Sequence, residues 1–283
     1  MPPEDDELID DGEDDSADTA EEPGRATRRR RPPPAPGTST VLEALDYAEP
    51  RPGAAARNKG TYGTYLSNAL ATVVANQLRP SFPGILPDPD GHGHESRART
   101  AKGFKKLDVN YSTVELGLAL GVSIKTINYR DPGTRRYTKN YSRVDNELRA
   151  EAIDYHQRQP YAVLAGLLFL PYDACDDAGV GPRQERGVSS FGAAVRYFRN
   201  RAPRGAVDDA VDLFERFFVG LYEHEGLSRG DAVFYDISDL SSVPPPRNRR
   251  PRPDEVVDLT EALNRIVATY DARNDPPFHW ATD

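Results

Sequence analysis

The sequence contains little that would suit a secreted or membrane-embedded protein. Its only cysteine is Cys175, so no internal disulfide is available, and such usage is typical of a reducing compartment. No apolar run approaches the roughly 20 residues that a membrane-spanning helix needs. The first residues are acidic, which is not the pattern of a secretory signal. We therefore expect a cytoplasmic protein with no membrane partner.

Several catalytic signatures are also missing. The chain contains no GxxxxGK[ST], no GxGxxG, no HExxH and no CxxC. These absences argue against a P-loop, a dinucleotide-binding fingerprint, a zincin-type metal site and a paired-cysteine site. His92 and His94 form an HxH, but they lie in a polar, Gly-rich loop, where we interpret them as solvated side chains.

Charge is distributed very unevenly along the chain. Residues 1–23 contain twelve Asp or Glu and no Lys or Arg, and five arginines follow within residues 24–31. Removing these charges from the net charge of −9 leaves −2 for residues 32–283. We therefore expect residues 1–55 to be a disordered tail that either solubilises the protein or covers a basic surface. The nearly neutral remainder means that nucleic-acid binding would require a local basic patch.

The most informative segment is residues 105–128, which predicts two β-strands near 105–112 and 116–128. Period-two alternation places every second side chain on the same side of a strand. The first strand then has an apolar face of Leu107, Val109 and Tyr111, and a polar face of Lys106, Asp108, Asn110 and Ser112. The second has an apolar face of Leu116, Leu118, Leu120, Val122 and Ile124, and a face of Gly117, Ala119, Gly121, Ser123 and Lys125. If the apolar faces share one core, we expect Asp108, Ser123 and Lys125 to meet on the opposite side.

The remaining elements place this hairpin in an α/β protein. Apolar residues at helical spacing predict helices over residues 62–78, 143–158, 190–201, 208–223 and 255–272. Residues 161–170 are apolar throughout and predict a strand covered on both sides, and 231–237 predict a short strand. A Pro- and Arg-rich stretch near 243–253 is expected to be a disordered loop. Alternating helices and strands indicate an α/β fold with a mixed sheet.

The hairpin carries residue types that phosphodiester hydrolysis needs. Mg²⁺ prefers oxygen ligands and is commonly held by one or two carboxylates together with phosphate and water. Asp108 offers one carboxylate, and the backbone carbonyl at Ser123 offers a second oxygen. Lys125 would orient the attacking water or stabilise the charge that develops on phosphorus. An ion pair between Asp108 and Lys125 on an amphipathic hairpin is the structural alternative.

The pair Leu107-Asp108 and the triplet Ser123-Ile124-Lys125 resemble the motif of the PD-(D/E)xK nuclease superfamily, which has the restriction-endonuclease-like fold. The resemblance covers about residues 60–172. It implies a core of helix, mixed β-sheet, helix and strand, with an appended C-terminal helical lobe. The domains expected are a tail (1–55), a nuclease-like core (56–175) and the lobe (176–283).

Ser123 stands where the superfamily has an acidic residue. Some restriction enzymes of the superfamily have Ser-x-Lys at this point and recruit a Glu from the following helix. Glu147 and Glu151, one turn apart on the helix predicted over 143–158, are the candidates here. The resemblance thus implies a metal held by Asp108, Ser123 and Glu147, with Glu151 as the other candidate acid. The alternative is that both glutamates belong to a solvated helix face.

The resemblance implies a Mg²⁺-dependent DNA endonuclease, with Mn²⁺ able to substitute, acting in antiviral defence or DNA processing. Its partners would be DNA and either a second copy of the chain or the subunits of a defence complex. Predicted phosphate contacts are Lys105, Lys106, Arg135, Arg136, Lys139 and Arg158. Two other interpretations stay open: a non-catalytic DNA-binding or assembly subunit with a degenerate nuclease fold, and a protein-interaction scaffold.

Overall fold

The computed structural model describes residues 38–49, 51–53, 58–93, 96–100, 103–179, 187–239 and 246–274. The helices are α1 (Val41–Ala48), α2 (Lys59–Leu78), α3 (Tyr141–His156), α5 (Ser190–Phe198) and α6 (Leu259–Arg273). The strands are β1 (Ser96–Thr100), β2 (Gly103–Leu107), β3 (Val109–Thr113), β4 (Gly117–Thr126), β5 (Val163–Pro171), β6 (Arg216–Tyr222) and β7 (Ala232–Asp236). Short 3-10 helices cover Thr138–Asn140, Tyr172–Cys175, Arg199–Arg201 and Pro253–Glu255. None of the helices in these ranges is both long and apolar enough to cross a membrane.

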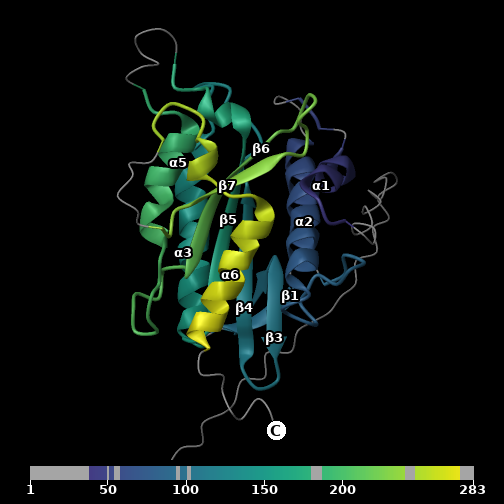
Figure 1. Ribbon diagram of the computed structural model, residues 1–283, viewed down its shortest axis with the longest axis vertical. Coiled ribbons are helices and arrows are strands. Elements are labelled where there is room, and N and C mark those ends of the chain that lie inside the picture. Colours follow the sequence, from purple (N-terminus) through teal and green to yellow (C-terminus); the bar gives the residue numbers. More distant parts are fainter. Residues whose placement is uncertain are drawn as a thin grey trace, which may run out of the picture. The chain divides into compact units, whose positions relative to one another are not determined.

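Five strands form one mixed sheet in the order β3-β4-β5-β6-β7 (Figure 1). β3 is antiparallel to β4, β5 and β6 run parallel to β4, and β7 is antiparallel to β6. β4 and β5 are joined through α3, as expected when two parallel strands need a crossover. The order α2, β3, β4, α3, β5 confirms the predicted α/β class and the predicted core of helix, sheet, helix and strand.

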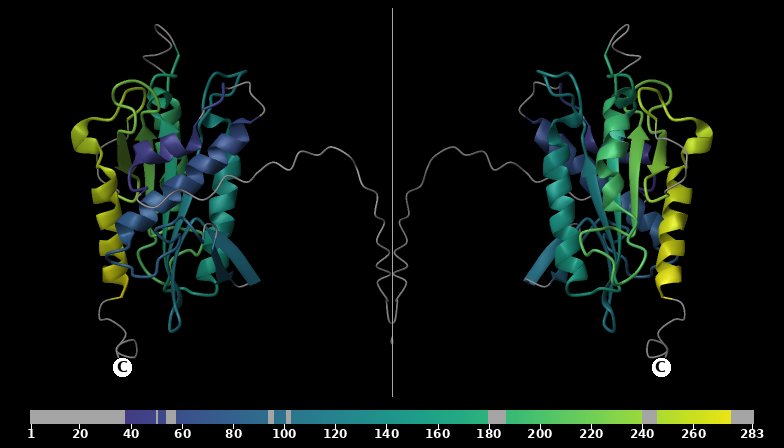
Figure 2. Two further views of the ribbon diagram at one scale, coloured as in Figure 1. Left: turned by 90° about the vertical axis from the view of Figure 1, so that its right-hand side faces the viewer. Right: turned by 90° about the vertical axis from the view of Figure 1, so that its left-hand side faces the viewer.

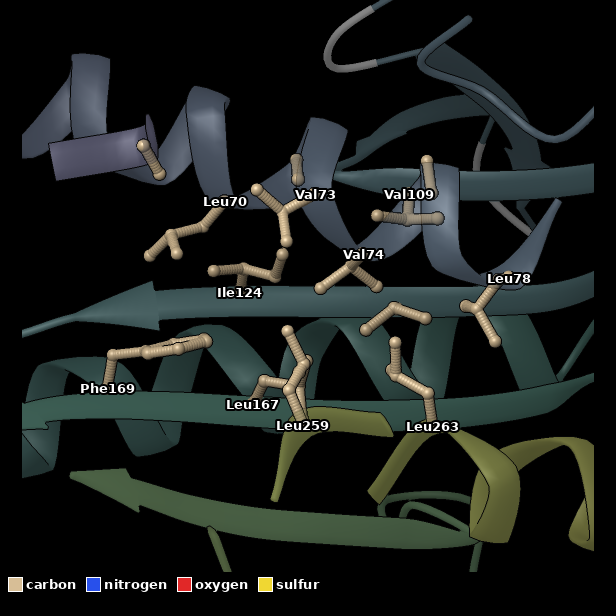
Figure 3. Close-up of a cluster of buried hydrophobic side chains, with 14 of the residues drawn as sticks. Leu70, Val73, Val74, Leu78, Val109, Ile124, Leu167, Phe169, Leu259 and Leu263 are labelled. Atoms are coloured by element: carbon tan, nitrogen blue, oxygen red, sulfur yellow. The ribbon is translucent and has the colours of Figure 1, made fainter. Parts of the chain in front are cut away.

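Helices cover both faces of this sheet. One apolar cluster joins α1, α2 and α6 to the sheet, and a second joins α3 and α5 to the opposite face. The close-up in Figure 3 shows the first cluster, with Leu70, Val73 and Val74 of α2 directed at Ile124 of β4. On the second face, Leu148 of α3 is fully buried. β4 is therefore covered from both sides, and a polar side chain that it presents to either layer must find a partner there.

The first predicted strand is broken at Asp108. β2 ends at Leu107 and pairs with β1 in a separate two-stranded ribbon, whereas β3 begins at Val109 and pairs with β4. Because of this bend, Leu107 packs in the cluster under α3 while Val109 packs in the cluster under α2. The prediction that Leu107 and Val109 share one face of a single strand is therefore wrong.

The prediction of a helix over 208–223 is also wrong, because Arg216–Tyr222 is the strand β6. Phe217, Val219 and Leu221 pack toward α3 and α5, while Phe218 and Tyr222 pack on the other side. Burial on both faces hides the period-two pattern that would have indicated a strand. β6 and β7 extend the central sheet, so residues 176–283 do not form an appended helical lobe.

Two segments predicted to be disordered are ordered where the structure describes them. Residues 1–37 of the expected tail lie outside the described residues, but α1 follows at once, and Thr40 and Glu43 form a capping box at its start. Its buried face of Val41, Ala44, Leu45 and Ala48 explains why it folds. Within the Arg-rich loop, residues 246–253 are described, and the carbonyl of Arg247 accepts a hydrogen bond of 2.8 Å from the backbone N–H of Ser189.

Candidate active site

A cleft of about 740 Å³ opens at the end of β4, between the first turns of α2 and α3. β4 and β5 are parallel, and the crevice outside the carboxyl ends of such strands is a common ligand-binding position. Asp108, Lys125 and Glu147 lie in its wall. Further lining residues are Lys59, Gly60, Gly63, Thr64, Ser67, Asn68, Ile124, Thr126, Ile127, Asn128, Tyr129, Arg130, Asp131, Pro132, Tyr137, Lys139, Asn140, Arg143 and Val144.

Asp108 occupies the bend between β2 and β3. Its Oδ2 accepts a hydrogen bond of 2.6 Å from the backbone N–H of Ile124 in β4. Val109 is the register partner of Val122, so the residue before Val109 lies beside the Ser123-Ile124-Lys125 triplet. The bend thus places the carboxylate of Asp108 beside the second half of the motif.

Ser123 and Lys125 alternate with Ile124 along β4, and both side chains contact Glu151 of α3. The Ser123 hydroxyl donates to Oε2 of Glu151 over 2.5 Å, and Nζ of Lys125 donates to Oε1 over 2.7 Å. Glu151 is 17% exposed and Lys125 is 18% exposed, so water screens this ion pair only partly. The interpretation of Glu151 as part of a solvated helix face is therefore wrong.

Glu147 lies farther from the motif. Its Oε2 is 3.8 Å from Nζ of Lys125, and its Oε1 accepts a hydrogen bond of 2.6 Å from Arg143, one turn earlier on α3. Its side chain is 40% exposed at the cleft. Of the two glutamates, Glu151 accepts the hydrogen bonds from β4, whereas Glu147 lies at the rim with Arg143.

The acidic surroundings keep Lys125 charged. Burial favours the neutral amine, but the charge and the hydrogen bond of Glu151, with smaller contributions from Asp108 and Glu147, raise the pKa of Lys125 above its usual value. Lys125 is therefore an ammonium ion at neutral pH. As such it supplies positive charge and hydrogen-bond donors, and it does not accept a proton.

The donor set fits a hard divalent cation. Asp108 and Glu151 supply carboxylate oxygens and Ser123 supplies a hydroxyl, all oxygen ligands of the kind that Mg²⁺ and Ca²⁺ prefer. Both carboxylates are bonded to neighbouring residues of the same triplet, Asp108 to Ile124 and Glu151 to Ser123 and Lys125. Asp108, Ser123 and Glu151 are thus the residues that could hold a metal ion here.

Several cleft residues were not foreseen from the sequence. The α2 wall consists of Lys59 and of small or polar residues: Gly60, Gly63, Thr64, Ser67 and Asn68. These residues recur at helical spacing on a helix that is otherwise largely apolar. This spacing is the feature of the sequence from which a polar, cleft-facing side of α2 could have been predicted. Tyr155 does not line the cleft but lies near the charges of the site. It is fully buried, and burial together with the charges of Glu151, Asp154 and Asp108 raises the pKa of its hydroxyl well above the usual value.

The predicted phosphate contacts are scattered over the surface. Among the six, Lys139 alone lines the cleft described above, and it is bonded to Asp131 at 2.6 Å. Lys105 is bound to the carboxylate of Asp154 and Arg136 to the carbonyl of Val188. Lys106, Arg135 and Arg158 are exposed.

A second group of possible metal ligands lies in the loop before β1. One carboxylate oxygen each of Asp88 and Asp90 and one ring nitrogen of His92 lie within 4.8 Å of one another. His94, which the sequence associates with His92, is outside the described residues. The carboxylate of Asp88 caps this loop by accepting the backbone N–H groups of Asp90 and His92. These contacts are those of an ordinary Asx-type turn.

Comparisons with known proteins return little. No family model matches the sequence, and no curated protein matches it. The structure is similar to that of SfsA from Pyrococcus furiosus, solved in complex with Ca²⁺, with 16% sequence identity and a TM-score of 0.26. The match covers 61% of this chain and 63% of SfsA, so the chain spans less than two thirds of that protein. With likeness this low, the functional assignment depends on the residues of the chain itself.

Proposed function

We propose that this protein is a divalent-metal-dependent nuclease that hydrolyses phosphodiester bonds in DNA. One observation carries the proposal: two carboxylates from separate elements, Asp108 and Glu151, are both bonded to the triplet Ser123-Ile124-Lys125. Glu151 comes from the helix that follows β4 and contacts Ser123, which stands where an acidic residue is expected. The pattern is that of a Ser-x-Lys nuclease motif whose missing acid is supplied by α3.

The cleft suits a phosphate-bearing substrate. α2 and α3 both begin at it, and neither has an acidic residue in its first turn or a side chain bonded to its first turn as a cap. Helix N-termini carry partial positive charge and favour phosphate groups. Lys139 is bonded to Asp131 and Arg143 to Glu147, but the basic side chains of the lining still outnumber the acidic ones: Lys59, Lys125, Arg130, Lys139 and Arg143 against Asp108, Asp131 and Glu147. A polyanionic strand is therefore the kind of ligand that the electrostatics of the cleft favour.

The residues divide the chemical work between them. Asp108, Ser123 and Glu151 would hold a Mg²⁺ or Mn²⁺ ion, which when bound neutralises phosphate charge and makes water a better nucleophile. Lys125, kept protonated by Glu151, would stabilise the negative charge that develops on the phosphoryl oxygens. The bond from Ile124 N–H fixes the orientation of Asp108 before any ligand binds.

A cleavage assay tests this proposal. Supercoiled plasmid and linear duplex are incubated with the protein in Mg²⁺, in Mn²⁺ and in EDTA, with Asp108→Asn and Lys125→Ala alongside and Arg196→Ala, on the remote helix α5, as control. We expect metal-dependent nicking that both site variants abolish and the control retains. Intact DNA with every metal, from protein whose circular dichroism shows it folded, would refute the nuclease.

A second candidate is a DNA-binding or assembly subunit that does not cleave. It is favoured by the fact that both oxygens of Glu151 are already bonded, to Ser123 and to Lys125, as in a purely structural ion pair. The same experiment separates the two, because this subunit would shift DNA in a gel and leave it intact in every metal. Protein that neither shifts nor cuts DNA would favour the scaffold interpretation.

A further inference from the structure

We propose that the β1–β2 ribbon is an arm that contacts the backbone of duplex DNA beside the cleavage site. This inference rests on the proposed function, since it concerns how the same active site is placed on its substrate. Residues 96–107, which contain the ribbon, include five Lys or Arg and no Asp or Glu. In Figure 2 the two strands lie beside α3, and they form a ribbon separate from the five-stranded sheet.

The register of the ribbon concentrates positive charge on its outer face. Arg97 of β1 and Lys106 of β2 are direct cross-strand partners, and both are exposed. A phosphate group placed over this face could contact both exposed side chains, so the arrangement points to a polyanion as the partner of this face.

The inner face of the ribbon is anchored to the body of the protein. Ala98 and Leu107 are buried in the cluster that contains α3. Lys105, on the same face, is paired with the carboxylate of Asp154 and donates to the carbonyl of Ala150, both in α3. The ribbon is thus held in a fixed position, and its outer charges are presented without a large loss of conformational freedom on binding.

The arm is continuous with the active site. Lys106 precedes Asp108 by two residues, so their Cα atoms lie no more than about 7 Å apart. A phosphate bound at Lys106 would therefore be close to the one beside Asp108. Arg97 also lines a groove of about 670 Å³ together with Arg158 at the end of α3, with Glu115 as the acidic residue in its wall. The positive surface thus continues from Lys106 through Arg97 to Arg158.

The shape of the arm favours duplex DNA as the partner. The major groove of B-form DNA admits a two-stranded β-ribbon, whereas the major groove of A-form RNA is too deep and narrow for side chains to read. A single strand offers no groove for the ribbon to enter. We therefore expect duplex DNA to gain more from the arm than duplex RNA or single-stranded DNA of the same sequence.

The test measures binding separately from cleavage. Fluorescence anisotropy with a labelled DNA duplex, in EDTA and over a range of salt concentrations, compares the wild type with R97Q/K106Q. The matched control is R196Q/R199Q, two exposed arginines near the end of α5, which Figure 1 places far from β1. Duplex RNA and single-stranded DNA are measured in parallel, and the melting temperature of each variant checks folding.

We expect R97Q/K106Q to bind duplex DNA about tenfold more weakly. The salt slope should fall by about two, because each substitution leaves one phosphate without its positive partner. The control variant should bind as the wild type does. An unchanged affinity and salt slope for R97Q/K106Q, or an equally large effect on duplex RNA, would show that the ribbon is not a DNA-binding arm. If the wild-type protein binds DNA through the ribbon but never cleaves it, the proposed nuclease activity is wrong and the proposed DNA-binding role of the ribbon is retained.

Discussion

Glu151 of α3 and Ser123 of β4 are joined by a hydrogen bond of 2.5 Å, although they are 28 residues apart in the sequence. The contact brings a helix carboxylate to the strand position at which an acidic side chain is expected. Its second oxygen holds Lys125 at 2.7 Å. The completeness of the candidate active site therefore depends on how α3 packs against β4.

The two glutamates of α3 should differ in their effect on activity. Glu151→Gln removes the negative charge beside Ser123 and Lys125, and we expect DNA cleavage to fall by about 100-fold or more, equivalent to about 2.7 kcal/mol of transition-state stabilisation. Glu147→Gln alters a residue at the rim, so a change of less than about fivefold is expected. Initial rates of plasmid nicking in Mg²⁺ measure both effects. A larger loss for Glu147→Gln than for Glu151→Gln would show that Glu147, and not Glu151, completes the site.

A glutamate at position 123 of β4 should be able to replace the carboxylate of Glu151 in DNA cleavage. In S123E/E151A the carboxylate returns to β4 and the helix side chain that would collide with it is removed. We expect the double variant to regain at least about tenfold of the activity lost in Glu151→Ala, since the charge again lies beside Lys125. S123Q/E151A is the matched control of similar size without charge. Equal nicking rates for the two double variants would contradict the idea that Glu151 replaces an acid at position 123.

Metal binding should be measurable without DNA. A ligand that binds only the folded state stabilises it by RT ln(1 + [L]/Kd), about 2.7 kcal/mol at 100 times Kd. We expect Mg²⁺, Mn²⁺ or Ca²⁺ to raise the melting temperature of the wild type and to have much less effect on Asp108→Asn and Glu151→Gln. D88N/H92Q serves as control for the cluster in the loop before β1. If that variant, and neither site variant, abolished the shift, the metal would bind in the loop.

The ion pair of Lys125 should make stability depend on alkaline pH. Its pKa is raised in the folded protein above the usual 10.5, so its contribution to the free energy of unfolding is complete below that pH. The contribution is lost as pH rises through the folded pKa. The difference in unfolding free energy between wild type and Lys125→Met, from urea titrations, should therefore be constant from about pH 7 to pH 10 and shrink above it. A difference that grew above pH 10 would contradict the sign of the shift.

A fully buried charge cluster at the end of α3 opposite to the cleft should be essential for stability. Glu215 accepts hydrogen bonds from Arg204 at 2.9 Å and from the backbone N–H of Leu164 at 2.8 Å, and His156 lies 3.3 Å away. Glu215→Ala leaves the buried guanidinium of Arg204 without its carboxylate, and we expect a loss of about 3–5 kcal/mol. Urea unfolding measures this.

The exposed pair of Glu261 and Arg265, with atoms 3.0 Å apart, provides the control for that measurement. Glu261→Ala should cost no more than about 1 kcal/mol, because water and salt screen a surface ion pair. Comparable losses for Glu261→Ala and Glu215→Ala would show that burial of the cluster contributes nothing special to folding.

Local patterns in the sequence were sufficient to predict the core around the motif. Helical spacing indicated α2 and α3, the fully apolar run indicated β5, and alternation indicated the strand that carries Ser123 and Lys125. These signals depend on the period of one element and on its own burial, which the sequence records directly. They fail where burial is complete on both faces, and this is why β6 resembled a helix.

The sequence by itself therefore determined the α/β class, the Asp108 and Ser123-x-Lys125 motif and the two glutamates that could complete it. Tertiary structure alone decided that the chain bends at Asp108, that Glu151 reaches Ser123 while Glu147 stays at the rim, and that β6 and β7 extend the sheet. The physical reason is that periodicity shows which face of an element is buried, whereas the neighbour that covers this face depends on packing between residues far apart in the chain.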